Sequence, residues 1–404
     1  MRNFFAVSTA IASGIVSGDN GGEDLMKPFD EEVENFMKPR FIPGASLAVF
    51  NNGSIVYEKA YGFADIDKKT RTTNSTLFRI ASLSKPLTAV GILKLVEQNK
   101  LNLDAPIVEL LKGLFENFEE KITDKRWFKI TVRHLLQHTG GWDSALSGDP
   151  MFFSQEKIGA VIGRTPRSPV DIIEFMLSRK LDFDPGARYA YSNFGYCVLG
   201  RVIEQTSRMR YEDYIKQNIL KPLSIENMHL GATNFEKRRT DESIYYTAFN
   251  NEEMKNLHFN EKSNPYGSFQ LERMDAHGGW ISTAFDYARF CIALTEKAKK
   301  KILTADSWKT LVSIPEHLVK EDKKEAETYY GCGWQVRPLG KNGKPNLWHY
   351  GSLPGTFSFA AVLGDGTGWV VLFNGRSVDE SLPGHDIDSA LHRAAGKIKE
   401  LPSL

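Results

Sequence analysis

The order of strand-like and helix-like segments places the strongest constraint on the fold of this chain. Strand-like runs form two groups, one within 44–64 and the other within 330–375, and helix- and loop-rich sequence fills about 101–270 between them. Segments so far apart can share one sheet if the middle of the chain folds as an insert. The sequence therefore predicts an α+β fold, with an antiparallel β-sheet flanked by helices and a large inserted, mostly α-helical domain.

Turn residues separate the strand-like runs. Asn51-Asn52-Gly53 joins GASLAVF to SIVYEKAYGFA, and an Asn-Gly pair between two such runs is typical of a tight hairpin. The second group consists of YGCGWQV (330–336), TFSFAAVL (356–363), the Asp365-Gly366 turn and WVVLFNG (369–375). Ser168-Pro169 indicates a capped helix in the insert, YEDYIKQNIL (211–220) a second helix, and a helical tail is expected from about 386 to 400.

These patterns divide the chain into three expected parts. Residues 1–26 are a flexible leader or a possible signal segment, 27–100 and 271–404 form an α/β domain with the antiparallel sheet, and 101–270 form an inserted helical domain. The apolar stretch Phe4 to Val16 is too short and too polar to span a bilayer, so no integral membrane segment is expected. Because this stretch has only some features of a signal peptide, a secreted or periplasmic location and a cytoplasmic location are equally open.

The charge balance and the cysteines exclude several classes of partner. Lys and Arg number 51 and Asp and Glu 50, so the net charge of +1 offers no general attraction to nucleic acid. The three cysteines are far apart and contain no Cys-x-x-Cys pair, so neither a disulfide framework nor a thiolate metal site is indicated. We expect no metal and no cofactor, and the oligomeric state stays open.

Ser82 and Lys85 form the first candidate catalytic pair. Leu87, Val90 and Leu93 recur every three residues after Pro86, which predicts a helix that begins close to Ser82. Residues three apart at a helix start lie on one side, so the lysine can activate the serine if its pKa falls from about 10.4. Unpaired N–H groups at the helix start favour an oxyanion. The same Ser-x-x-Lys spacing recurs at 154–157, without an apolar helix that starts with proline.

Tyr191-Ser192-Asn193 is the second candidate motif. It is the only Tyr-x-Asn in the chain, and it directly precedes a helix-like stretch from 195 to 205. A tyrosine held beside an ammonium group can ionise below its usual pKa of about 10 and relay protons. An asparagine amide can hold a substrate carbonyl or amide. We therefore expect Tyr191 to be catalytic and Asn193 to bind substrate.

His349-Tyr350-Gly351-Ser352 is the third candidate motif. A loose Lys-or-His, x, Gly pattern also occurs at Lys157, Lys341, His138, His229 and His277. Only His349 both follows the tyrosine motif and leads into a clear strand. Backbone N–H groups on an edge strand can bind substrate and complete an oxyanion hole. We therefore expect His349, Gly351 and Ser352 to bind substrate.

With these three motifs in this order, the chain resembles the serine β-lactamase and penicillin-binding-protein superfamily. The resemblance is to the class C β-lactamase-like branch, which includes esterases and D-Ala-D-Ala carboxypeptidases, and it covers nearly all of residues 30 to 400. Besides Ser82-x-x-Lys85 and Tyr191-x-Asn193, the segments that carry it are FRIASLSKPLTAVGILKLVEQNKL (78–101), ITVRHLLQHTGGW (130–142), PGARYAYSNFGYCVLGRVIE (185–204), GGWISTAFDYARF (278–290) and HYGSLPG (349–355).

The resemblance implies a β-lactamase/transpeptidase-like fold and acyl transfer through an ester of Ser82. Lys85 and Tyr191 would remove and relay the serine proton, and the N–H groups of Ser82 and Ser352 would hold the oxyanion. β-Lactamases of this branch typically carry lysine where this chain has His349, and a mostly neutral imidazole meets a substrate carboxylate less well. The expectation is a serine hydrolase acting on a small-molecule ester, amide or peptide. The alternatives are a β-lactamase and a non-catalytic scaffold or filament-forming member of the fold.

Overall fold

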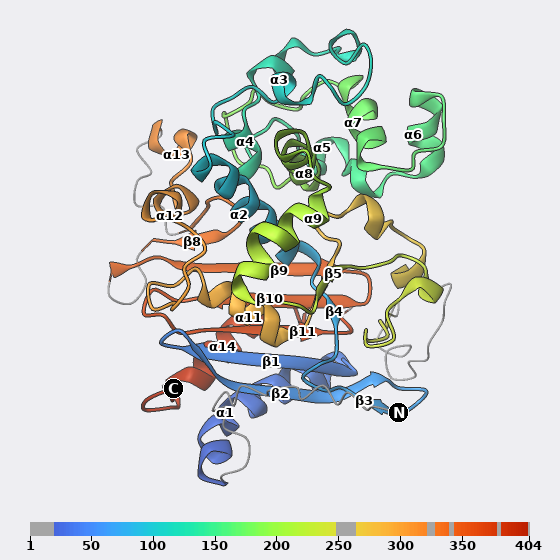
Figure 1. Cartoon of the computed structure of the whole chain (residues 1–404). Helices are drawn as coiled ribbons and strands as arrows, with labels where there is room; N and C mark the ends of the chain where they lie inside the picture. Colours follow the sequence, from blue (N-terminus) through green and yellow to red (C-terminus); the bar gives the residue numbers. More distant parts are fainter. Residues whose placement is uncertain (1–19, 248–263, 321–327, 339–342, 378–380, 403–404) are drawn as a thin grey trace, which may run out of the picture.

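The fold is built on one large antiparallel sheet. The computed structural model describes residues 20–247, 264–320, 328–338, 343–377 and 381–402 (Figure 1). Eight strands follow the order β3-β2-β1-β11-β10-β9-β8-β7, so strands from the two ends of the chain meet where β1 pairs with β11. The strands are β1 (Gly44–Asn51), β2 (Ser54–Asp65), β3 (Thr70–Arg71), β7 (Tyr329–Tyr330), β8 (Gln335–Arg337), β9 (Asn346–Leu353), β10 (Thr356–Val362) and β11 (Gly368–Phe373). The fold class predicted from the sequence is confirmed.

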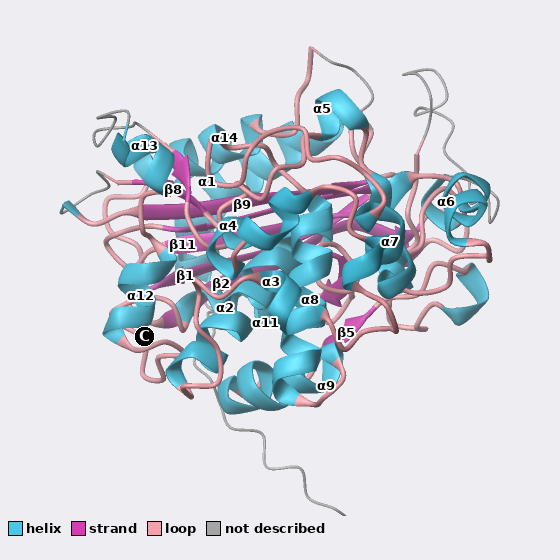
Figure 2. Cartoon of the chain, turned by 90° about the horizontal axis from the view of Figure 1, so that it is seen from above, coloured by secondary structure: helices cyan, strands magenta, loops and turns pink. Residues whose placement is uncertain are grey.

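Helices cover both faces of this sheet. Helices α1 and α14 lie together on one face, and α2, α8 and α11 lie on the other (Figure 1). The helices are α1 (Asn20–Met37), α2 (Ser84–Glu97), α3 (Ile107–Leu111), α4 (Val132–Leu136), α5 (Ser144–Ser147), α6 (Gln155–Ile162), α7 (Pro169–Leu177), α8 (Asn193–Ser207), α9 (Tyr211–Ile215), α11 (Ala284–Ile292), α12 (Ala305–Leu311), α13 (Glu316–Lys320) and α14 (Asp386–Gly396). Figure 2 shows α3, α4, α7 and α8 gathered above the strands.

Alternation along the central strands produces two apolar cores. In β11, Trp369 and Val371 face α1 and α14, whereas Val370 and Leu372 face the core built around α2 and α8. All six residues of β11 are buried, because helices cover both of its faces. The α2 side forms the larger core, and the candidate catalytic residues lie on that side of the sheet.

Several local predictions are confirmed. Asn52 and Gly53 have φ of 49° and 82° and connect β1 to β2 in the expected hairpin. Ser168 caps α7 in a capping box with Asp171. Residues 211–220 are helical, as α9 and the π-helical turn η6 (Lys216–Leu220). The tail helix α14 is shorter than expected and ends at Gly396.

Other segments differ from the sequence-based expectations. The run 330–336 is interrupted at 331–334, where Gly333 has φ of 81° and lies against the backbone of Lys85, so two short strands replace one. Helix α1 begins at Asn20 and so takes in the end of the expected leader 1–26; residues 1–19 lie outside the described residues. The expected insert 101–270 contains a strand, β5 (Met228–Leu230). The division into a sheet domain and an inserted domain stays a prediction.

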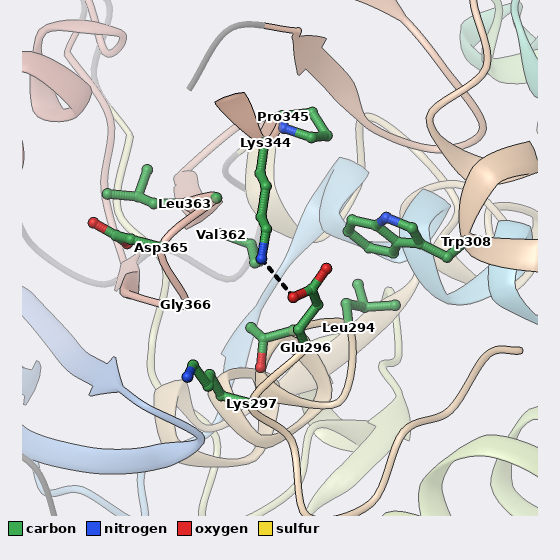
Figure 3. A pocket seen from close by; sticks show the side chains of 12 residues that line it. Leu294, Glu296, Lys297, Trp308, Lys344, Pro345, Val362, Leu363, Asp365 and Gly366 are labelled. Carbon is green, nitrogen blue, oxygen red and sulfur yellow. Dashed lines mark hydrogen bonds and ion pairs between the residues drawn. The ribbon is translucent and has the colours of Figure 1, made fainter. Parts of the chain in front are cut away.

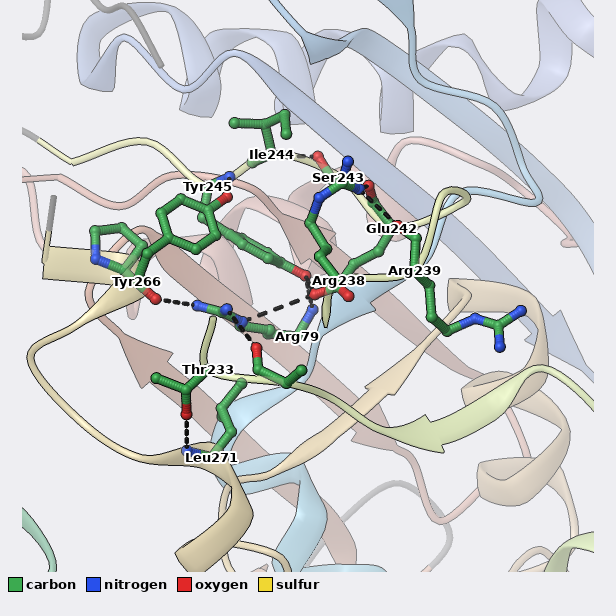
Figure 4. Close-up of polar contacts among 12 residues, drawn as sticks. Arg79, Thr233, Arg238, Arg239, Glu242, Ser243, Ile244, Tyr245, Tyr266 and Leu271 are labelled. Carbon is green, nitrogen blue, oxygen red and sulfur yellow. Dashed lines mark hydrogen bonds and ion pairs between the residues drawn. The ribbon is translucent and has the colours of Figure 1, made fainter. Parts of the chain in front are cut away.

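A second, three-stranded sheet leads into Ser82. It has the order β4-β6-β5, with β4 (Phe78–Arg79) and β6 (Trp280–Ser282). The buried Arg79 side chain donates to the Pro265 and Ala232 carbonyls at 2.6 and 3.1 Å, and its Nε lies 3.8 Å from Glu242 (Figure 4). The Tyr245 hydroxyl accepts from the Arg79 N–H at 2.7 Å and donates to Glu242 at 2.8 Å. This network fixes β4, and therefore the start of the serine turn.

Within the described ranges, no helix combines the length and the apolar character needed to cross a bilayer.

Candidate active site

Ser82 lies in a tight turn between β4 and α2. The turn is the 3-10 helix η2 (Ala81–Leu83), and Ala81 has φ of 47°, in the left-handed region that costs a non-glycine residue on the order of 1 kcal/mol. Ser358 Oγ donates to the Ile80 carbonyl at 2.8 Å, and the Ile80 N–H donates to the Trp280 carbonyl at 3.0 Å. These bonds hold the strained backbone that presents Ser82.

Three predicted catalytic side chains meet at the Ser82 hydroxyl. Lys85 Nζ lies 3.0 Å from Ser82 Oγ, and the Tyr191 hydroxyl lies 2.9 Å from the same atom. The turn and α2 position Ser82 and Lys85, while Tyr191 comes from the loop before α8. Groups more than 100 residues apart in sequence are thus within hydrogen-bonding reach.

The environment of Lys85 favours a neutral amine. The side chain is completely buried, and burial lowers the pKa of Lys85 well below its ordinary value, against a smaller opposing effect of the Asp149 charge. Lys85 Nζ donates to Asn193 Oδ1 at 2.7 Å and to the His277 carbonyl at 3.0 Å. Neither acceptor has a proton to give, so these two bonds use both N–H groups of a neutral amine. Its lone pair then points to Ser82, as a general base requires.

Tyr191 differs from the expectation that it ionises easily. It contacts Lys85, whose Nζ lies 4.7 Å from the centre of the ring, but burial raises the pKa of the Tyr191 phenol above its ordinary value. The cause is loss of solvent, which disfavours a phenolate more than the hydrogen bond with Ser82 stabilises it. Tyr191 is therefore a neutral donor to Ser82 Oγ in the resting protein, and the low-pKa tyrosine expected from the sequence is not supported.

Gly351 allows β9 to lie directly beneath the serine turn. A Cβ at this position would lie 2.3 Å from the Ile80 carbonyl oxygen, 2.2 Å from Ser358 Oγ and 3.1 Å from the Ser82 nitrogen. No side chain larger than hydrogen fits this gap. The structure thus brings Gly351 next to Ser82 through backbone approach.

Ser352 directs its side chain away from the serine turn. Its side chain is exposed, accepts from Arg376 Nη1 at 3.1 Å and follows the buried Gly351, so it lies on the opposite face of the strand. β8 pairs only with residues 346–348 of β9, which leaves 349–353 without a strand partner on that edge among the described residues. Among the described residues, no backbone carbonyl accepts a hydrogen bond from the Ser82 N–H.

His349 lies on the same face of β9 as Gly351, but its ring is turned into the protein. It is 4% exposed; Nδ1 donates to the Tyr350 carbonyl at 2.6 Å, which leaves Nε2 to accept from the Tyr330 hydroxyl at 2.9 Å. Burial, together with the nearby Lys85, lowers the pKa of His349 to about 3. A substrate-binding role for this imidazole stays a prediction.

Neutral His349 has a consequence for stability that can be measured. Its folded pKa lies below the ordinary value of about 6.5, so as pH falls below 6.5 the unfolded chain binds a proton that the folded chain excludes. Stability is therefore lost with falling pH, by up to about 1.4 kcal/mol per unit for one such group. We expect His349→Gln to reduce the loss of unfolding free energy between pH 7 and pH 5, measured by urea denaturation.

The control for this measurement is His385→Gln, at an exposed position. It should leave the pH dependence as in wild type. Equal slopes for wild type and His349→Gln would show that His349 gains its proton in the folded chain as readily as in the unfolded one.

The surface pocket drawn in Figure 3 lies away from these residues. An ion pair between Lys344 and Glu296 crosses it, and Trp308, Val362 and Leu363 contribute to its wall. These residues border the start of β9 and the end of β10, whereas Ser352 lies six residues further along β9, a distance of about 20 Å. This pocket is not part of the candidate catalytic site.

Sequence reasoning did not find several residues that surround the site. Asp149 accepts from Asn193 Nδ2 at 2.7 Å, and Tyr330 contacts His349. The buried rings of His138 and Tyr191 lie 4.4 Å apart, centre to centre. Asp149-Pro150 carries the signature of a helix cap, but nothing in the sequence places it beside Asn193. Tyr330 has no local signal, and His138 has only its match to the loose Lys-or-His, x, Gly pattern.

The chain is similar to known proteins along most of its length. The profile of the family described as Beta-lactamase matches residues 29–392. Protein flp of Staphylococcus aureus (strain NCTC 8325 / PS 47) is 26% identical over 336 residues, which cover 83% of this chain and 60% of that protein. The chain spans about 40 to 60% of the length of the curated relatives it matches.

Two solved structures have a similar fold. The octameric penicillin-binding protein homologue from Pyrococcus abyssi has a TM-score of 0.70 at 26% identity, over 95% of this chain and 80% of that one. The D-amino acid amidase from Ochrobactrum anthropi SV3 also has a TM-score of 0.70, at 21% identity over 93% and 99% of the two chains, and shows the fold alone. Since the family profile covers most of the sequence, the chain belongs to the beta-lactamase family, within the serine β-lactamase and penicillin-binding-protein superfamily.

Proposed function

We propose that this protein is a serine hydrolase that forms an acyl-enzyme on Ser82 with a small ester, amide or peptide. The observation that carries the proposal is the convergence of Lys85 Nζ and the Tyr191 hydroxyl on Ser82 Oγ, at 3.0 and 2.9 Å. A serine hydroxyl is a weak nucleophile until a base removes its proton, and the neutral amine of Lys85 meets that need.

Acylation begins with proton transfer to Lys85. As Ser82 Oγ bonds to the substrate carbonyl carbon, its proton moves to Lys85 Nζ, and the carbonyl oxygen becomes an oxyanion. The Ser82 and Ser352 N–H groups are proposed to hold that oxyanion. The tetrahedral intermediate then expels the alcohol or amine. Tyr191 is proposed to donate its phenolic proton to the leaving group and to recover one from the Lys85 ammonium.

Deacylation reverses these roles. A water molecule attacks the ester carbonyl and loses its proton to Lys85, again through an oxyanion held by the same N–H groups. The Ser82–acyl bond breaks, Ser82 Oγ regains a proton, and the acid product leaves. Every proton in this cycle moves between water, substrate, Ser82, Lys85 and Tyr191.

The uncharged ring of His349, in the third motif, affects the class of substrate that the site can bind. His349 is neutral and its two ring nitrogens are occupied, so it brings no positive charge to a substrate carboxylate. This favours esters, amides or peptides over β-lactams. The edge of β9 at 349–353, which pairs with no strand among the described residues, is suited to an extended acyl or peptide group, which would add to the sheet. We propose Asn193, Gly351 and Ser352 as the backbone and amide groups beside that substrate.

A substrate panel tests the proposal. Short-chain nitrophenyl esters, D-amino-acid peptides and a chromogenic cephalosporin are assayed against wild type and Ser82→Ala. We expect turnover of at least one ester or peptide by wild type and a loss of at least about 10³-fold in Ser82→Ala. Cephalosporin as the best substrate would establish the β-lactamase alternative. No Ser82-dependent turnover of any member would favour a non-catalytic scaffold.

A further inference from the structure

We propose that Asp149 is a positioning residue for catalysis, which fixes the orientation of the Asn193 amide and thereby the hydrogen bonding of Lys85. This rests on the proposed serine hydrolase function. Asp149 lies in the loop between α5 and α6, and Asn193 is the physical link between Asp149 and Lys85.

Asp149 follows Ser82 in the chain and precedes Asn193 by 44 residues, so the contact between the two side chains is made only by the fold. One carboxylate oxygen, Oδ1, accepts from the Met151 N–H at 3.0 Å and caps the short 3-10 helix η5 (Pro150–Phe152). The other oxygen, Oδ2, accepts from Asn193 Nδ2 at 2.7 Å. The bond from the Met151 N–H is sufficient to cap η5. The bond from Asn193 Nδ2 links Asp149 to the candidate active site.

The contact with Asp149 decides which end of the Asn193 amide faces Lys85. A carboxylate has no proton to give, so it can only accept, and Asn193 must turn its Nδ2 group toward Asp149. That leaves Oδ1 toward Lys85 Nζ, at 2.7 Å. With the amide reversed, its N–H groups would face the lysine and compete with Ser82 for the lone pair of Lys85.

Asp149 is also the charged group that acts on Lys85. Burial lowers the pKa of Lys85, and the negative charge of Asp149 opposes that shift. The other titratable groups that face the amine are the rings of Tyr191, Tyr196, His138, His277 and His349. Burial keeps these phenols and imidazoles neutral by raising the pKa of the tyrosines and lowering the pKa of the histidines. Removing the Asp149 charge should therefore lower the pKa of Lys85.

Two variants of Asp149 separate the charge from the hydrogen bond. Asp149→Asn keeps an acceptor for Asn193 Nδ2 but removes the charge, whereas Asp149→Ala removes both. The experiment measures kcat/KM against pH for an activated ester, and its acid limb reports the general base of the free enzyme. We expect Asp149→Asn to move this limb to lower pH by up to about one unit, with a plateau within about threefold of wild type. Asp149→Ala should show the shift and lose about tenfold or more at the plateau.

Asp143, the cap residue that precedes α5, provides a matched control. It caps α5 by accepting from the Ala145 N–H at 3.0 Å and pairs with Arg188, but it makes no contact with Asn193 or Lys85. Asp143→Asn and Asp143→Ala remove a comparable cap and should leave the acid limb in place. Melting temperatures of the four variants show whether a lost cap alone explains a change in activity.

The outcomes separate this inference from the proposed function. Equal activity of wild type and Ser82→Ala would overturn the proposed function itself. Ser82-dependent activity with an unmoved acid limb in both Asp149 variants would overturn only the role of Asp149. A plateau loss in Asp149→Ala that is matched by Asp143→Ala would also overturn it, because the effect would then be structural. If Asp149→Ala fails to fold, the acid limb of Asp149→Asn decides.

Discussion

Lys85→Met is expected to lower kcat/KM for an activated ester by about 10³-fold or more while the chain stays folded. The methionine side chain has a similar length but no nitrogen that could accept a proton, so Ser82 loses its base. The variant also leaves Asn193 Oδ1 and the His277 carbonyl without a donor, which costs stability. It removes a fully buried amine as well, and this offsets part of that cost. The measurements are steady-state kinetics and thermal unfolding on the same preparation.

Lys94→Met is the control for this prediction. Lys94 belongs to the same helix, α2, and forms a partly exposed ion pair with Glu97 at 2.6 Å. Its loss should change stability by no more than about 1 kcal/mol and leave kcat/KM near wild type. Wild-type activity in Lys85→Met would exclude Lys85 as the base. A stability loss large enough to unfold the variant would make Lys85 a structural residue.

Gly351→Ala should damage both stability and activity. The added Cβ would lie 2.3 Å from the Ile80 carbonyl oxygen, a backbone atom that cannot move without the serine turn. Overpacking of this kind costs about 2 to 3 kcal/mol. A shift of the turn by about 1 Å would misplace Ser82 relative to Lys85 and reduce turnover by about 10²-fold. Urea denaturation and ester kinetics measure the two effects.

Gly396→Ala is the control for Gly351→Ala, at a glycine where an added Cβ has room. Gly396 ends α14, and no heavy atom lies within 4 Å of the Cβ position. We expect unchanged activity and a stability change of at most about 1 kcal/mol, in the stabilising direction. If Gly351→Ala were as stable and as active as Gly396→Ala, β9 would not support the serine turn as described.

Local patterns predicted the parts of the fold that depend on local chemistry. The Asn52-Gly53 hairpin and the Ser168 cap of α7 follow from backbone preferences of a few neighbouring residues. Helix α1 was missed, although Met26, Phe29, Val33 and Phe36 are all buried on its inner face at helical spacing. The break between β7 and β8 depends on the contact of Gly333 with α2, which is a tertiary effect that the apolar run does not show.

Within the candidate site, the sequence predicted a contact from spacing only where both residues belong to one short motif. Ser82 and Lys85 share one turn, so their contact follows from spacing. The contact of Tyr191 with Ser82 was implied by the resemblance to the superfamily. The Asp149–Asn193 bond and the burial of Lys85 arise from packing of distant segments, and the pKa of Tyr191 follows that burial. Solvent exclusion, which decides which group is the base, is a property of the folded chain.

The central claim is that Ser82 itself becomes acylated, and rapid quenching followed by peptide mass mapping tests it most directly. The wild-type protein is mixed with an activated ester, stopped in acid within the first turnover and digested. We predict that the acyl mass is found on the peptide that contains Ser82, and that Lys85→Met shows much slower labelling. Turnover of the ester with the acyl group on another residue, or equal labelling of Ser82→Ala, would contradict the account.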